Sequence, residues 1–197
     1  MRITDLLSEN AEDSGITLYH GGRRWEGSPE VRAAKQGRYE GGPGLYFTTS
    51  YNRARSYAKG GKVVTRITIP SNTRWLQDAE LPVSELQDFI RNTSGIRNKD
   101  KIIASLSRSA ERQQSDVIGV EQLVNLCINY EALVGKTGIE LARWLVNHGI
   151  DASHQSMSGE DWVVVFNPSI IKNATVMDPS KLKSDDFDLP RVNRNIN

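Results

Sequence analysis

The order of strand-like and helix-like segments is the feature that most restricts how this chain can fold. Five segments are rich in β-branched or aromatic residues, and each predicts a strand. Between the third and the fourth of them, residues 80–147 repeat apolar residues with a helical period. Strands at both ends with helices between them predict an α+β fold, in which late strands close the sheet and the helices pack around it. The predicted strands are residues 16–20, 45–49, 62–70, 161–171 and 173–177.

Local signals predict where several helices begin and end. Ser50 stands at the N-cap position of a predicted helix over residues 51–59, and a pair of glycines follows that helix. Similar signals elsewhere in the chain are candidate N-caps at Ser84 and Thr137 and, at Gly149, a glycine suited to the position after a helix end. A short helix is also predicted over residues 3–12.

Composition and charge limit the classes of protein to which this chain can belong. The chain has 197 residues, with 25 basic and 24 acidic side chains and a net charge of +1, so it gives no overall electrostatic reason to bind a polyanion. Its single cysteine, Cys127, lies in an apolar helical pattern and predicts a buried thiol in a reducing compartment. No apolar run approaches the roughly 18–20 residues that span a bilayer, and the N-terminus lacks a signal-peptide pattern. We therefore expect a single cytoplasmic domain over residues 1–177 with no membrane partner, followed by a polar, frayed tail over 178–197.

Common motifs for phosphate, metal and nucleophilic chemistry are missing from the sequence. No GxxxxGK[ST] pattern is present, and the glycines at 37, 41, 42 and 44 precede a strand, whereas a dinucleotide fingerprint needs them after one. His148 and His154 with Asp151 between them are better explained as surface or capping residues than as metal ligands, so we expect no metal. The GxSxG pattern of a serine nucleophile is also missing.

Three segments together resemble a known family. They are "LYHGG" (18–22), "GLYFTTSYNRARSYA" (44–58) and "GEDWVVVFNPSIIKNATV" (159–176). In order and spacing they resemble the ADP-ribosyltransferases of the His-Tyr-Glu type, which includes diphtheria toxin and the poly-ADP-ribose polymerases, and in particular small bacterial or phage members. The resemblance covers residues 15–70 and 149–177. It implies a split β-sheet core with a helical insertion at about 80–147, in a protein that acts in the cytoplasm (the host's, if a phage encodes it).

The resemblance also implies roles for individual residues around NAD. His20 is expected to hydrogen-bond the ribose of the adenosine half, and Gly21 to offer backbone groups to the carboxamide of nicotinamide. Tyr46 and Tyr57, eleven residues apart, are expected to stack on either side of the nicotinamide ring. The loop over 23–43 is expected to cover the dinucleotide.

One position departs from the family pattern. A serine often stands three residues before the second tyrosine, where it contacts the carboxamide, and here that residue is Ala54. Ser50 or Ser56 is the candidate to take over this contact.

The catalytic acid is one of two neighbouring residues, Glu160 and Asp161. Both stand at the start of the last long strand, where a period of two places them on opposite faces. The aromatic residue that often follows the family glutamate favours Asp161, because Trp162 comes next, whereas side-chain length favours Glu160. A carboxylate there would stabilise the positive charge that develops on the ribose as nicotinamide leaves. We favour Glu160 as the catalytic acid and retain Asp161 as the alternative. His20 and Tyr46 complete the set of candidate catalytic residues.

The resemblance implies a mono-ADP-ribosyltransferase that uses NAD as co-substrate, needs no metal and modifies a protein more readily than a nucleic acid. An NAD glycohydrolase and a catalytically inactive binding module with the same fold are the alternatives; an RNA 2′-phosphotransferase is a more distant one. Basic residues in the loop over the pocket are expected to pair with the NAD pyrophosphate. The helical block over 80–147 either binds the target or only builds the core. The basic loop residues are Arg23, Arg24, Arg32, Lys35 and Arg38.

Overall fold

A computed structural model describes residues 15–33 and 39–193 of the chain. Its largest element is a six-stranded sheet with the spatial order β6-β7-β2-β1-β3-β8, in which every neighbouring pair is antiparallel. This sheet, together with five α-helices among the described residues, confirms the α+β class. The strands are Ile16–Gly22 (β1), Leu45–Thr48 (β2), Val63–Ile69 (β3), Ala152–Met157 (β6), Glu160–Val165 (β7) and Lys172–Val176 (β8).

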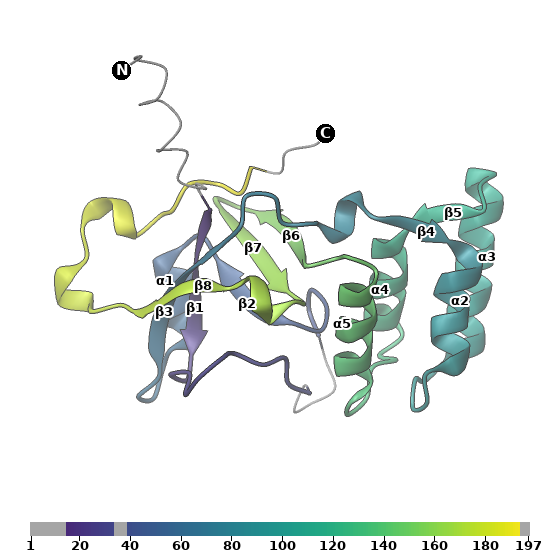
Figure 1. The fold of residues 1–197 in the computed structure, drawn as a ribbon, viewed down its shortest axis with the longest axis horizontal. Helices are drawn as coiled ribbons and strands as arrows, with labels where there is room; N and C mark the ends of the chain where they lie inside the picture. The colour runs from purple at the N-terminus through teal and green to yellow at the C-terminus, as the bar shows by residue number, and fades with distance from the viewer. Residues whose placement is uncertain (1–14, 34–38, 194–197) are drawn as a thin grey trace, which may run out of the picture.

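Four of the helices lie in the segment with the helical sequence pattern, and one lies beside the sheet (Figure 1). Two three-residue strands within the helical segment pair with each other, and they are too short to leave a period in the sequence. Within the described part of the chain, no helix is long and apolar enough to cross a membrane. The helices are Tyr51–Tyr57 (α1), Val83–Asn92 (α2), Lys99–Gln113 (α3), Val120–Asn129 (α4) and Thr137–Asn147 (α5); the short strands are Glu80–Pro82 (β4) and Val117–Gly119 (β5).

The sheet consists of two halves that meet at one pair of residues. Strands β2 and β7 pair over four positions and β1 and β3 over seven, whereas β1 and β2 share only the pair Tyr19–Thr48. The same register would place Gly21 opposite Tyr46, but the ladder stops before reaching them. Because backbone groups that leave a ladder need other partners, the β1–β2 junction is where side chains or a ligand can enter the sheet.

Different elements cover the two halves on one face of the sheet. Strand alternation places Tyr19, Val64 and Val164 on this face. Helix α1 packs on Tyr19 and Val64, while the helical block packs on Val164. Figure 1 shows α4 and α5 beside the sheet and α2 and α3 beyond them. The junction of β1 and β2 therefore lies between the two coverings. A separate cluster closes the opposite face; it includes Leu18, Phe47, Ile67, Trp75, Val163, Val165 and Val192.

The helix boundaries confirm some of the predicted caps and correct others. Ser50 caps α1, and its hydroxyl accepts from the backbone N–H of Arg53. Gly149 follows the end of α5 with a φ of +77°, as a glycine after a helix end does. Ser84 is not a cap, because α2 begins one residue before it, at Val83. Thr137 is the first residue of α5 rather than its cap, and the helix predicted over 3–12 lies outside the described residues.

The C-terminal segment is more ordered than the frayed tail that its composition predicts. Leu189 and Val192 are buried, and the backbone N–H of Leu189 donates to the carbonyl of Thr49. The backbone N–H of Val192 donates to the carboxylate of Asp161, 2.7 Å away. A few apolar residues and one buried carboxylate are enough to hold a polar segment along the sheet, and composition alone does not reveal them.

Asp161 is the residue through which this segment is held. Its carboxylate is 1% exposed at the side chain and accepts from Ser156, Arg191 and the Val192 backbone. Burial by itself raises the pKa of Asp161, but these hydrogen bonds and the nearby charges of His154 and Arg191 outweigh it, so the pKa lies below the ordinary 3.8. The ionised carboxylate is thus favoured in the folded protein.

We expect Asp161→Ala to lower the free energy of unfolding by about 2–4 kcal/mol, because it leaves buried donors without an acceptor. The exposed Asp185→Ala serves as the control and should change it by less than about 0.5 kcal/mol. Because the folded-state pKa is lowered, the stabilisation is complete above the unfolded pKa and disappears as pH falls through the folded value. Urea unfolding at several pH values measures both effects, and a difference that persists unchanged at the lowest pH would contradict this account.

Candidate active site

A cavity of about 540 Å³ opens over the junction of β1 and β2, and we call it the central cavity. Its walls come from the end of β1, from β2 and the residues before it, from α1, and from β7. It thus lies where the sheet ladder is interrupted and where the two coverings of the sheet leave a gap. The lining residues are Tyr19, His20, Gly21, Arg32, Tyr39, Glu40, Gly44, Tyr46, Phe47, Thr48, Arg53, Ala54, Tyr57 and Trp162.

The imidazole of His20 bridges the opening between β1 and β2. Its Nδ1 lies 2.9 Å from the carbonyl oxygen of Tyr46, and because a carbonyl only accepts, Nδ1 carries the proton. The ring packs beside Trp25 and Phe47, with centroids 5.1 and 5.6 Å away. Burial lowers the pKa of His20, against the opposing effect of the bond to Tyr46. The neutral ring therefore keeps Nε2 as a hydrogen-bond acceptor, which suits a ribose hydroxyl.

Gly21 is required by the close approach of β1 to α1. A Cβ atom at this position would lie 1.7 Å from the carbonyl oxygen of Ala54, so no other residue fits without moving the backbone. Ala54 is itself buried, with 1% exposure, and packs with Tyr19 and Val64. The alanine that departs from the family pattern is thus part of the contact between the helix and the sheet.

The ring of Tyr46 is held by its hydroxyl. This hydroxyl donates to the carbonyl of Gly42 at 2.8 Å and accepts from the backbone N–H of Gly41 at 3.2 Å. Gly42 has a φ of +112°, a conformation that favours glycine. Burial raises the pKa of the Tyr46 hydroxyl, so it remains a neutral donor. The glycine-rich segment before β2 therefore fixes the orientation of one wall of the cavity.

The second tyrosine lies at the rim of the same cavity. Tyr57 is 51% exposed and meets Trp162 edge-on, with ring centroids 6.3 Å apart. Tyr46 and Tyr57 both line the central cavity, as expected for a pair that grips a flat ring. Trp162 lines the cavity beside Tyr57, although in the sequence it stands out only as the neighbour of the two acids.

Glu160 and Asp161 face opposite sides of the sheet. Glu160 lies on the same face as Trp162, and its Oε1 accepts from Trp162 Nε1 at 2.8 Å and from Arg53 Nε at 2.7 Å. Glu160 is not itself among the residues that line the central cavity, but both of these donors are. Asp161 points to the other face and holds the C-terminal segment. Of the two acids, Glu160 is the one that the fold brings to the cavity.

The two serines that were candidates for a carboxamide contact have local roles on α1. Ser50 caps the helix, and the hydroxyl of Ser56 donates to the carbonyl of Arg53 at 2.7 Å. Neither is among the residues that line the central cavity. Arg53 is the residue of this helix that reaches the acid, through a side chain that is 50% exposed.

A second cavity continues the central one under the basic loop. This loop cavity, of about 500 Å³, shares His20, Arg32 and Gly44 with the central cavity. It adds Arg23 and Arg24 together with Glu26 and Glu30, so three arginines and two glutamates line this end of the hollow. Among the described residues, no group of three or more His, Cys, Asp or Glu side chains is placed to hold a metal ion. Lys35 and Arg38 lie outside the described residues.

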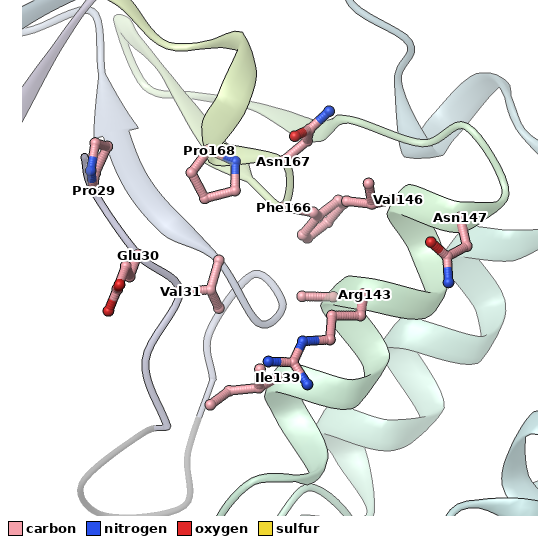
Figure 2. A pocket seen from close by; sticks show the side chains of 11 residues that line it. Pro29, Glu30, Val31, Ile139, Arg143, Val146, Asn147, Phe166, Asn167 and Pro168 are labelled. Carbon is pink, nitrogen blue, oxygen red and sulfur yellow. The ribbon is translucent and has the colours of Figure 1, made fainter.

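A separate cavity of about 520 Å³ lies between the same loop and helix α5 (Figure 2). Val31 on the loop side faces Ile139 and Arg143 of the helix across it. Its charged lining residues, Glu30 and Arg143, are both exposed. None of the residues predicted to bind NAD is among those that line it.

Comparison with known proteins finds no matching family model, no matching curated protein and no matching solved structure.

We expect Gly21→Ala to lower the free energy of unfolding by about 2–3 kcal/mol, because its Cβ would overlap the Ala54 carbonyl. Gly119→Ala is the matched control, since a Cβ there meets nothing within 4 Å, and its effect should stay within about 1 kcal/mol. Urea unfolding of both variants measures the difference. Equal stability of the two variants would show that β1 and α1 separate easily.

The imidazole of His20 should titrate below the ordinary histidine pKa of 6.5 and carry its proton on Nδ1 when neutral. A lowered folded-state pKa means that the unfolded chain binds more protons, so stability is complete above pH 6.5 and falls as pH drops below it. Nitrogen-15 NMR of the imidazole measures the tautomer and the midpoint. In a His20→Gln variant, the loss of stability below pH 6.5 that His20 causes should disappear. A titration midpoint of the His20 imidazole above 6.5 would contradict the lowered pKa.

Proposed function

We propose that this chain is a mono-ADP-ribosyltransferase that cleaves NAD, releases nicotinamide and passes ADP-ribose to a protein acceptor. One observation carries the proposal: three segments that are distant in sequence meet in the central cavity, and the Glu160 carboxylate is hydrogen-bonded to Arg53 and Trp162 of its wall. The lining residues from these segments are 19–21, several between 44 and 57, and Trp162, and they fall within the three segments on which the family resemblance is based.

The proposed orientation of NAD follows the shape and charge of the hollow. The nicotinamide ring lies between Tyr46 and Tyr57, next to the backbone of Gly21. The pyrophosphate lies toward the loop cavity, where Arg23 and Arg24 supply positive charge. His20 lines both cavities and so stands between the two halves of the dinucleotide, with Nε2 as acceptor for a ribose hydroxyl.

In this proposal Glu160 is the catalytic carboxylate. The bond from ribose C1′ to nicotinamide nitrogen breaks with both electrons going to nicotinamide, which leaves as a neutral molecule while positive charge develops on the ribose. A carboxylate next to that ribose lowers the barrier by electrostatic stabilisation. The hydrogen bond from Trp162 holds Glu160 in place, and the half-exposed Arg53 is free to turn toward a phosphate when NAD enters.

The two alternatives differ in what happens after NAD binds. In an NAD glycohydrolase water attacks the ribose, so free ADP-ribose is the product. An inactive module binds NAD and releases nothing. The exposed position of Tyr57 beside Trp162 favours a site open to a large acceptor, and for this reason we place transfer first.

The experiment that tests the proposal is incubation of the protein with adenylate-labelled NAD and a bacterial lysate. Label on protein and free nicotinamide are the expected products. Free ADP-ribose without labelled protein would show that the protein is an NAD glycohydrolase and not a transferase. NAD binding without any nicotinamide release would leave only the inactive module.

We expect Glu160→Gln to reduce nicotinamide release by about 10²–10⁴-fold, because the neutral amide no longer stabilises positive charge on the ribose. The exposed Glu111→Gln on α3 is the matched control and should retain activity. Release is measured by chromatography, and unfolding by urea shows whether the variant remains folded. A folded Glu160→Gln protein with normal release would remove Glu160 from the mechanism.

A further inference from the structure

A fourth cavity, of about 420 Å³, adjoins the central cavity, and we call it the lateral cavity. Glu40, Tyr46 and Trp162 line both the central and the lateral cavity, so the two hollows share a wall. Strand β6 extends the floor, because its residue Gln155 pairs with Trp162 and shares its face. Helix α4 supplies the opposite side through Glu121, Val124 and Asn125.

The lateral cavity is lined by acidic side chains, whereas three arginines and two glutamates line the loop cavity. Glu40 and Glu121 come from different elements and both line it, and neither forms an ion pair with a residue within 15–33 or 39–193. No lysine or arginine is among its described lining residues. His154 also lines it, but its imidazole lies 3.4 Å from Asp161, on the other face of the sheet.

The remaining wall suits a cation better than an anion. Tyr46 and Trp162 present aromatic rings, which attract ammonium and guanidinium groups, and the guanidinium of Arg53 already lies over Trp162, 5.9 Å from the ring centroid. The amide side chains of Asn125 and Gln155 provide further acceptors. Trp162 also lines this cavity, and its indole N–H donates to Glu160. A group bound in this cavity is therefore held next to the proposed catalytic carboxylate.

We propose that the lateral cavity binds a lysine or arginine side chain of the protein acceptor and so selects acceptors with a basic residue near the modified group. This inference rests on the proposed function. It also gives the helical block a role in acceptor binding, because α4 carries Glu121 to the edge of the site. Met157 and Tyr57, 47% and 51% exposed, offer apolar contacts for the acceptor on the outer surface nearby.

The first test uses agmatine, a small guanidinium compound, and butylurea, a neutral compound of similar shape. Agmatine should shift the indole NMR signal of Trp162, and butylurea should bind at least about fivefold more weakly. Glu121→Gln should weaken agmatine binding by about fivefold, and adding Glu40→Gln should weaken it further; Glu111→Gln is the control. Equal binding of the two compounds, or agmatine binding unchanged in the double variant, would overturn the cation site.

The second test uses labelled NAD and a lysate. Agmatine should reduce the ratio of labelled protein to released nicotinamide, and Glu121→Gln should reduce the same ratio in its absence. A ratio unaffected by both would overturn acceptor selection by this cavity. The two proposals fail separately: a wild-type protein that releases no nicotinamide overturns the proposed function, while agmatine binding to it still supports a cation site.

Discussion

The hydrogen bond from the imidazole of His20 to the carbonyl of Tyr46 is the contact on which the candidate site depends. It forms where the ladder between β1 and β2 stops after one pair, so a side chain replaces the backbone in joining the two halves of the sheet. The interruption opens the central cavity, and the hydrogen bond sets the tautomer that leaves Nε2 as an acceptor. One interaction thus serves both the fold and the proposed binding of a ribose.

The coverings of the sheet determine what surrounds this opening. Helix α1 fits closely on β1 only because Gly21 has no side chain, and it carries Tyr57 and Arg53 to one edge of the cavity. The helical block packs on β7 and brings Glu121 to the other side. Three arginines and two glutamates thus line the loop end, while Glu40 and Glu121 line the end at α4. A dinucleotide with a negative pyrophosphate and an acceptor with a basic side chain would enter this hollow from opposite ends.

Much of the fold was predictable because its signals are local. Strands β1, β2 and β3 have β-branched or aromatic runs, and α1 has a serine at its N-cap. Strand β6 was missed, since half of it is exposed and no apolar alternation marks it. The order in the C-terminal segment was also missed, because it depends on Asp161, a contact between residues about thirty positions apart.

The sequence by itself determined that Glu160 and Asp161 occupy opposite faces of one strand, because side chains alternate along any strand. It also placed His20, Gly21, Tyr46 and Tyr57 on segments whose order and spacing resemble an NAD site. Only the tertiary structure decided which face of β7 meets the cavity, that Ala54 packs against Gly21, and that α4 supplies a carboxylate beside it. These three features depend on how segments that are distant in sequence pack together, and a local sequence pattern does not determine that packing.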